Sequence, residues 1–178
     1  MKVAVIGAGR LGRAFALRCA AAGFDVVLED VMPANLRRAQ DEYAELGGAG
    51  SLRVALTVED AVHDADVAVD FVPDELESKL EIFSLLDRMA PPRTILCTPT
   101  DALSITDLAS CTYRAPLCVG VRGALAGDAV ELVRSRFVAE DSLRLVGELL
   151  ARVGIATSVV DDTEEPMLVK NQTVDSRQ

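Results

Sequence analysis

The residues whose types and spacing most clearly indicate a chemical function are the glycines of Gly7-Ala8-Gly9-Arg10-Leu11-Gly12. They directly follow the apolar segment 2–6. In this spacing the first glycine permits a tight turn and the second lets the backbone approach a pyrophosphate. The third lets a following helix pack closely against the strand. The free N–H groups at the start of that helix would point at the phosphates. We therefore expect all six residues of this glycine loop to contact a dinucleotide cofactor.

An acidic residue after the next apolar segment completes the pattern. Val26-Val27-Leu28 should be the buried end of a second strand, which places Glu29 or Asp30 beside the adenosine ribose. We assign the ribose to Asp30, because Glu29 more plausibly continues the alternation of the strand. A carboxylate there would repel a 2′-phosphate, and no arginine follows before Arg37, so NAD is expected rather than NADP.

The elements that must position these residues alternate between strand and helix along the chain. Strands are expected at 2–6, 25–30, 52–57, 67–72, 94–98, 117–121, 129–134 and 155–160, and helices at 10–22, 33–46, 58–63, 76–89, 104–110 and 141–153. This order predicts an α/β fold, a Rossmann-type, doubly wound, mostly parallel sheet with helices on both faces. Residues 1–165 would form the NAD-binding domain, and 166–178 a polar tail of loop, short helix or partial disorder.

Composition excludes several classes of function. The net charge of −10 argues against nucleic acid as a partner, because phosphate binding needs a basic face. The longest apolar run is far short of the ~20 residues that cross a bilayer, and the N-terminus lacks a cleavage site, so we expect a cytoplasmic protein without membrane contact. The cysteines, at 19, 97, 111 and 118, show no metal-binding or disulfide spacing, so we expect reduced thiols and no metal.

A second block of sequence is more particular than the glycine loop. It consists of Asp70-Phe71-Val72-Pro73-Asp74, then Lys79, Phe83 and Leu86, and then Ile95-Leu96-Cys97-Thr98-Pro99-Thr100-Asp101-Ala102-Leu103-Ser104-Ile105-Thr106. Together with Val26-Val27-Leu28-Glu29-Asp30, this block resembles the NAD-binding domain of the 3-hydroxyacyl-CoA dehydrogenases. The resemblance covers about residues 1 to 165. It implies an NAD-dependent oxidoreductase of fatty acid metabolism, which in the family converts 3-hydroxyacyl-CoA to 3-oxoacyl-CoA.

The resemblance also assigns cofactor contacts beyond the glycine loop. Asp74 matches an acidic residue near the nicotinamide half, and Lys79 matches a cofactor-contacting lysine. Val72 and Thr98 belong to the same set, at the carboxyl ends of the fourth and fifth strands, where open α/β sheets bind ligands. Two alternatives stay open from the residues themselves. Asp74 could cap the helix 76–89, and Lys79 could be a solvated helix residue.

The catalytic pattern of that family is not matched. Family members use a His as proton acceptor, a Glu that orients it, and Ser and Asn that polarise the substrate oxygen. Their Asn-Thr-Ser-Ser stretch corresponds here to Pro99-Thr100-Asp101-Ala102, and their Gly-Leu-His-Phe-Phe-Asn-Pro motif to residues 117–123, with Val119 at the His position. Glu131 matches the orienting Glu, although it could also be a strand-edge carboxylate facing solvent. Asp101 and Glu131 remain the catalytic candidates.

In the family an all-helical domain follows, closes over the acyl-CoA and forms the dimer. This chain ends at Gln178, about where that domain would begin. We therefore expect weak or no stand-alone activity. We also expect a homodimer or a separate substrate-domain partner, and an acyl-CoA or a small hydroxy acid as substrate.

Two other functions remain open. The first is an active NAD-dependent oxidoreductase for another small hydroxy or oxo substrate, using Asp101, Glu131 or Tyr113, with Arg122 holding a substrate carboxylate. The only histidine, His63, precedes the fourth strand and so lies at the wrong edge of the sheet for the ~3 Å reach of a general base. The second is a non-catalytic structural or sensor homologue that acts through a dimer surface.

Overall fold

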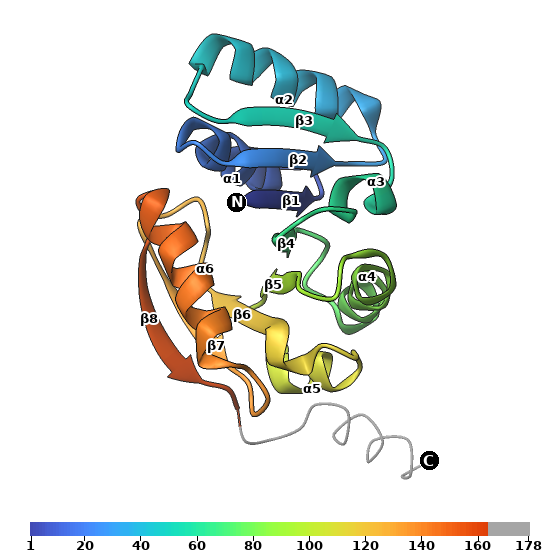
Figure 1. Cartoon of the computed structure of the whole chain (residues 1–178), viewed down its shortest axis with the longest axis vertical. Coiled ribbons are helices and arrows are strands. Elements are labelled where there is room, and N and C mark those ends of the chain that lie inside the picture. The colour runs from blue at the N-terminus through green and yellow to red at the C-terminus, as the bar shows by residue number, and fades with distance from the viewer. Residues whose placement is uncertain (164–178) are drawn as a thin grey trace.

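Short apolar strands alternate with helices from Lys2 onward, and all of the strands join one sheet (Figure 1). The computed structural model describes residues 1–163. The strands are β1 (Lys2–Ile6), β2 (Asp25–Glu29), β3 (Ser51–Ala55), β4 (Val67–Asp70), β5 (Ile95–Pro99), β6 (Cys118–Arg122), β7 (Ala129–Arg134) and β8 (Ala156–Asp161). The helices are α1 (Arg10–Ala21), α2 (Pro33–Leu46), α3 (Val58–Val62), α4 (Leu76–Met89), α5 (Ile105–Ser110) and α6 (Glu140–Arg152), with a 3-10 turn, η1 (Ala115–Leu117).

The strand order confirms the doubly wound, mostly parallel sheet. The order is β3-β2-β1-β4-β5-β6-β7-β8, and every pair from β3 to β6 is parallel. The chain moves outward from β1 to β3 and then crosses back to β4, so the order reverses between β1 and β4. At the far side β7 runs antiparallel to β6, and β8 runs parallel to β7. The carboxyl ends of β1 and β4 therefore meet at the switch point of the sheet.

Two apolar layers hold the helices to the sheet. Helices α1, α2 and α6 pack on one face, and α3, α4 and α5 pack on the other (Figure 1). Alternation along β1 shows the division, because Val3 and Val5 face the first layer while Ala4 and Ile6 face the second. Strands buried on both faces in this way are typical of parallel sheets.

The expected elements all form, with ends that move by up to two residues. Strand β4 ends at Asp70, so Val72 lies in the loop that follows it rather than in the strand. The turn η1 was not anticipated. The predicted tail, 166–178, lies outside the described residues, and the domain boundary at 165 remains a prediction.

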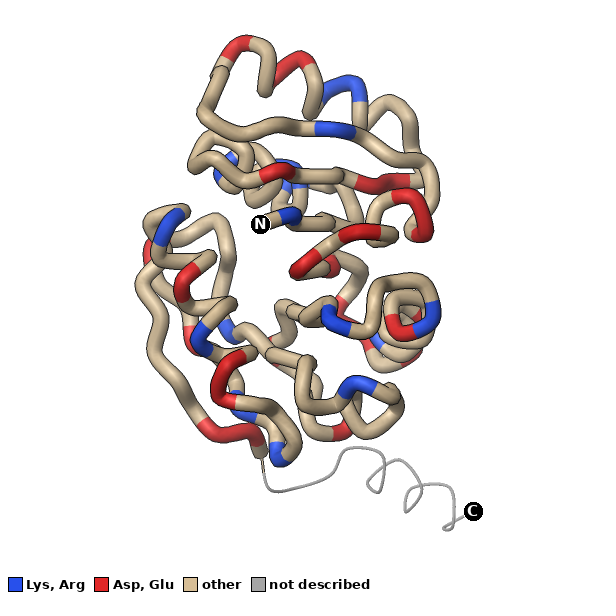
Figure 2. Tube along the Cα trace, in the orientation of Figure 1, with Lys and Arg blue, Asp and Glu red and all other residues tan. Residues whose placement is uncertain are grey.

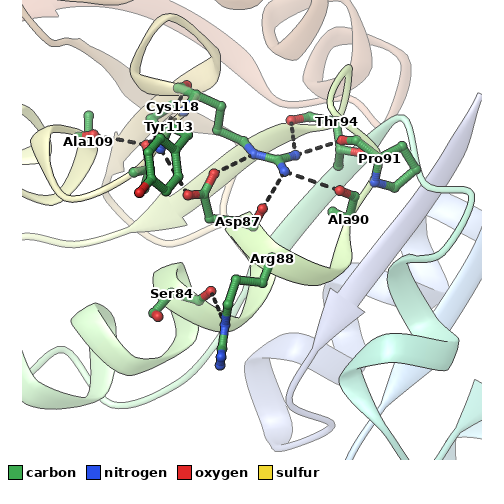
Figure 3. A network of polar contacts seen from close by, with 11 residues as sticks. Ser84, Asp87, Arg88, Ala90, Pro91, Thr94, Ala109, Tyr113 and Cys118 are labelled. Carbon is green, nitrogen blue, oxygen red and sulfur yellow. Dashed lines mark hydrogen bonds and ion pairs between the residues drawn. The ribbon is translucent and has the colours of Figure 1, made fainter.

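A buried arginine fastens the carboxyl end of α4. Arg114 donates to the carboxylate of Asp87 at 2.8 Å and to the backbone carbonyls of Asp87, Ala90 and Pro91 at 2.7, 3.1 and 2.7 Å. Figure 3 shows these acceptors converging on one guanidinium, with the Thr94 carbonyl beside them at 3.4 Å. The last carbonyls of a helix lack partners within the helix, so this arginine satisfies them.

The charged residues are spread along the chain, and the four cysteines are unpaired. Figure 2 shows acidic and basic residues interspersed along the chain trace, with acidic residues in excess. Cys19, Cys97 and Cys118 are buried and Cys111 is exposed, all as free thiols. Burial raises the pKa of Cys19 and of Cys97 to about 12, so these thiols stay protonated. In the described part of the chain no helix is long and apolar enough to cross a membrane.

Candidate functional site

A cavity of about 450 Å³ lies at the carboxyl edge of the sheet, over the switch point between β1 and β4. Its walls are the glycine loop from Gly9 to Gly12, the segments that follow β4, β5 and β6, and Lys79 of α4. Open α/β sheets bind ligands in this crevice, where the crossing connections leave a gap between adjacent strand ends.

The glycine loop has the geometry that its spacing predicts. Gly7 has a φ of 97°, in the left-handed region that favours glycine. A Cβ on Gly12 would lie 1.9 Å from the carbonyl oxygen of Gly7, so the helix approaches the strand too closely for any side chain. A Cβ on Gly9, in contrast, would meet no protein atom within 4 Å. The fold does not require glycine at position 9, and the space that its missing side chain leaves opens on the cavity.

Asp30 is oriented toward the glycine loop by three hydrogen bonds. Its carboxylate accepts from the backbone N–H of Ala8 at 2.7 Å, from that of Met32 at 2.7 Å and from the Asn35 amide at 3.2 Å. A carboxylate has about four lone-pair positions, so it can still accept from a ribose hydroxyl. Glu29 is buried within β2, and this burial, followed by the charge of Asp30, raises the pKa of Glu29.

Asp74 joins two of the loops that form the cavity. Its carboxylate accepts from the Thr100 hydroxyl and from the backbone N–H groups of Asp101 and Ala102, at 2.9 and 3.3 Å. The alternative that Asp74 caps α4 is wrong, because the N-cap residue is Glu75 and the Asp74 carboxylate is bonded to Thr100, Asp101 and Ala102 instead. Asp74 lines the cavity and fixes the loop after β5.

Lys79 is buried, which contradicts the alternative of a solvated helix residue. It is 1% exposed, and its ammonium donates to Asp70 at 2.7 Å and to the Pro99 carbonyl at 2.8 Å. It also lines the cavity. Thr98 is fully buried and does not line the cavity, so the structure gives no support to a direct cofactor contact by this residue. Its side chain lies instead by Asp70, where it lowers the pKa of that carboxyl while burial raises it more strongly.

A second cavity of about 480 Å³ adjoins the first and shares Asp101 and Gly123 with it. The Asp101 carboxylate accepts from the Gly123 N–H at 3.0 Å. Arg122, Glu131 and Ser158 line the remainder together with neighbouring backbone. Both catalytic candidates from the sequence, Asp101 and Glu131, therefore lie on this second cavity.

The residue opposite Glu131 across the sheet is Arg122. Arg122 and Glu131 are register partners on β6 and β7. Val119 is fully buried in the apolar layer on the other face of the sheet. Val119 and Glu131 thus lie on opposite faces of the sheet.

The other candidate side chains for catalysis or substrate binding lie in different parts of the molecule. Glu131 is solvent-exposed, as one interpretation held, but β7 is not an edge strand because β8 pairs beyond it. Arg122 lies 3.7 Å from Asp162 as an ion pair. Tyr113 is fully exposed after α5, and its backbone N–H bonds to Asp87 at the far end of α4. His63 is exposed at the start of the segment that leads into β4, away from both cavities.

The cavity thus gathers most of the residues that the sequence indicated. Those lining it are Gly9, Arg10, Leu11, Gly12, Val72, Asp74 and Lys79. Gly7, Ala8 and Asp30 support the loop from beside it. Sequence reasoning missed Phe71, Pro99, Thr100, Gly123 and Ala124. All five lie at the ends of β4, β5 and β6, so the rule that ligands bind at carboxyl strand ends could have found them. Within residues 1–163 no group of side chains is arranged to hold a metal ion.

Comparison with known proteins gives one family. The family model described as 3-hydroxyacyl-CoA dehydrogenase, NAD binding domain, matches residues 2–163. The chain is 29% identical to a probable 3-hydroxybutyryl-CoA dehydrogenase of Bacillus subtilis, over 97% of this chain and 66% of the relative. It is 27% identical to a 5-formyl-3-hydroxy-2-methylpyridine 4-carboxylate 5-dehydrogenase of Mesorhizobium japonicum, over 97% of this chain and 60% of the relative.

A solved structure supports the same relationship. The crystal structure of 3-hydroxybutyryl-CoA dehydrogenase from Escherichia coli K12 matches with a TM-score of 0.80 and 26% identity, covering 92% of this chain and 38% of that one. The chain spans less than two thirds of the length of these three proteins.

Proposed function

Because this chain belongs to the family of 3-hydroxyacyl-CoA dehydrogenase NAD-binding domains, we propose that it holds NAD in the cavity over the switch point and has weak or no 3-hydroxyacyl-CoA dehydrogenase activity of its own. The observation that supports weak or absent dehydrogenase activity is that Arg122 lies opposite Glu131. The proposal of an NAD site rests on the fit between the cavity and a dinucleotide.

The residues present fit a bound NAD. The open space at Gly9 admits a pyrophosphate against the backbone, and the start of α1 offers N–H groups without side-chain caps. Asp30 offers its remaining lone pairs to the ribose, and no basic side chain bonds to it that would favour a 2′-phosphate. Asp74 holds the loop from Thr100 to Ala102 in place as the wall at the opposite end. When bound, NAD supplies the hydride acceptor.

The side chains on the second cavity do not reproduce the family's proton acceptor. Arg122 is the register partner of Glu131, and a match of Gly120-Val121-Arg122 to the Gly-Leu-His of the family motif would put this arginine at the His position. A guanidinium stays protonated at physiological pH, so Arg122 cannot take the proton from a substrate hydroxyl. The Asn and Ser of the family are also replaced. The acids that line this cavity in the described chain are Glu131 and Asp101, and Asp101 is exposed and bonded to Gly123. These replacements support weak activity toward 3-hydroxyacyl-CoA.

The proposal also requires that another protein surface cover the second cavity, where the substrate would bind. Asp101 and Glu131 are both exposed there, whereas a hydride transfer site excludes water. A homodimer partner or a separate substrate-domain chain would supply that cover.

The proposal is tested by titrating the purified chain with NAD, NADH and NADPH, with thermal shift and fluorescence as readouts. We expect stabilisation by NAD and NADH. Asp30→Arg should weaken NAD binding at least about tenfold, as loss of a charge-assisted hydrogen bond predicts. The exposed acid Asp41 on α2 provides a matched control, and Asp41→Arg should leave the affinity unchanged.

Two results would contradict the proposal. Absence of stabilisation at millimolar NAD and NADH would exclude the cofactor site. Rapid oxidation of NADH with acetoacetyl-CoA by the chain alone would show that the replaced His, Ser and Asn are not needed.

One observation favours a second function, an NAD-dependent oxidoreductase for a small hydroxy or oxo acid. Arg122 lines the cavity that adjoins the cofactor cavity, and a guanidinium can bind a carboxylate through two parallel hydrogen bonds. The relative from Mesorhizobium japonicum has a substrate whose name includes a carboxylate. A panel of short 3-hydroxy and 3-oxo acids tests this function. If it holds, Arg122→Met should raise KM at least about tenfold and leave the Kd of NAD unchanged; an unchanged KM would exclude the carboxylate role.

A further inference from the structure

A buried ion pair lies at the wall of the cofactor cavity. Asp70 is the last residue of β4 and is 0% exposed, and Lys79 lies in the first turns of α4 and is 1% exposed. The ammonium is 2.7 Å from the Asp70 carboxylate and 2.8 Å from the carbonyl oxygen of Pro99, at the end of β5. Three elements that meet at the cavity therefore converge on one ammonium group.

This pair is not arranged for stability alone. Removing two charges from water costs free energy, which is recovered only when all of their hydrogen-bonding atoms find partners. Here the Asp70 Oδ2 atom and the Thr98 hydroxyl are buried without a hydrogen bond of good geometry. Burial accordingly raises the pKa of Asp70, against the opposing effects of Lys79, of the Thr98 hydroxyl and of the backbone N–H of Val72. Buried polar groups left partly unsatisfied in a cleft are typical of functional sites.

The other buried pair in the described chain shows the contrast. Asp87 and Arg114 are similarly buried, but neither has a buried side-chain oxygen or nitrogen atom that lacks a hydrogen bond, and the acceptors around the guanidinium are shown in Figure 3. Neither residue lines the cofactor cavity. Asp87 is thus a matched control for the removal of a buried carboxylate.

An ammonium has three donors, and the protein accepts from two donors of Lys79. Lys79 also lines the cavity. We propose that Asp70 is a positioning residue, which together with the Pro99 carbonyl holds Lys79 charged and directs its remaining N–H toward an oxygen atom of the dinucleotide. The inference rests on the proposed NAD site and adds the residue that keeps its lysine in place.

Without its counter-ion, a buried ammonium is destabilised and releases its proton more easily. Asp70→Asn should therefore weaken NAD binding about tenfold or more and make the Kd pH-dependent. The protonated lysine is the form that donates, so the affinity of the variant should fall as pH rises from 6 to 9, while that of the wild type stays flat.

Other groups around Lys79 do not account for such a difference. The Cys97 thiol on β5, which interacts with both charges, has a pKa of about 12 and does not titrate in this range. Asp74 and Asp101 line the same cavity and are the same in both proteins, so they cancel in the comparison. A purely structural Asp70 would lower the Tm of the variant without changing the pH profile of its NAD affinity.

A double-mutant cycle separates positioning from packing. Lys79→Met should weaken NAD binding to a similar extent, and Asp70→Asn should have no further effect on the Lys79→Met background. Asp87→Asn should lower the Tm and leave the Kd of NAD unchanged. Isothermal titration calorimetry at pH 6, 7.5 and 9 gives the affinities.

The outcomes are distinguishable from those of the proposed function. If the wild type binds NAD and Asp70→Asn binds it equally well at every pH, the positioning role is wrong and the NAD site stands. If the wild type does not bind, the NAD site itself fails. If Asp70→Asn does not fold, Lys79→Met decides, since an unchanged Kd in that variant overturns the inference.

Discussion

At the scale of single residues, the cofactor edge of the sheet contains acids with different tasks. Asp30 is held toward the glycine loop, Asp74 ties two loops together, and Asp70 holds an ammonium. Glu29 is next to Asp30 but is 5% exposed within β2. Its pKa is raised first by burial and then by the charge of Asp30. Ionised Glu29 is therefore a cost to the folded state.

This cost predicts a pH-dependent effect of Glu29→Gln. A carboxyl whose pKa is raised by folding adds stability below its usual pKa of 4.5 and loses it as pH rises through the folded value. The amide has the same shape and no charge, so the variant should have a higher Tm than the wild type at pH 8. The difference should shrink toward pH 4.5. Thermal melts across this range check it, with the exposed Glu45→Gln as control; a difference independent of pH would point to packing instead.

At the scale of elements, the junction of β1 with α1 and the two ends of α4 define the cofactor side. Helix α4 is fixed near its start by Asp70 and Lys79 and at its end by Asp87 and Arg114. The cavity wall is thus anchored at both ends of one helix. At the β1–α1 junction, a Cβ at position 12 would collide with the Gly7 carbonyl, whereas a Cβ at position 9 would enter open space.

This division predicts opposite effects for two alanine substitutions in one loop. Gly12→Ala would place a Cβ against the rigid Gly7 carbonyl and should destabilise the fold by about 1–3 kcal/mol or more. Gly9 has a φ of −62°, which alanine adopts freely, so Gly9→Ala should change the stability by less than about 0.5 kcal/mol. Its methyl group should nevertheless weaken NAD binding about tenfold. Chemical denaturation and NAD titration measure both, and unchanged NAD affinity in Gly9→Ala would argue against a pyrophosphate at this loop.

At the scale of the whole molecule, two cavities meet along the carboxyl edge, and they differ in completeness. The one over the switch point is formed by four loop segments of this chain and by a buried lysine. The adjoining one is lined by Asp101 and Glu131, which are both exposed, and by Arg122 at the end of β6. The cavity of this NAD-binding domain that lies over the switch point is thus formed entirely by described residues. The adjoining cavity presents Asp101, Arg122 and Glu131 as its ionisable side chains.

The sequence by itself determined the order of the elements, the parallel sheet, the glycine loop and the acid at Asp30. These follow from periodicity and spacing within short segments, which record local structure directly. Only the tertiary structure decided which side chains face one another across strands. Arg122 rather than Val119 lies opposite Glu131, because side chains alternate between the faces of a sheet, so an odd shift in register moves a residue to the other side. Likewise Lys79 is buried and Asp74 is bonded to the loop after β5, because parallel strands bring together loops that are distant in sequence.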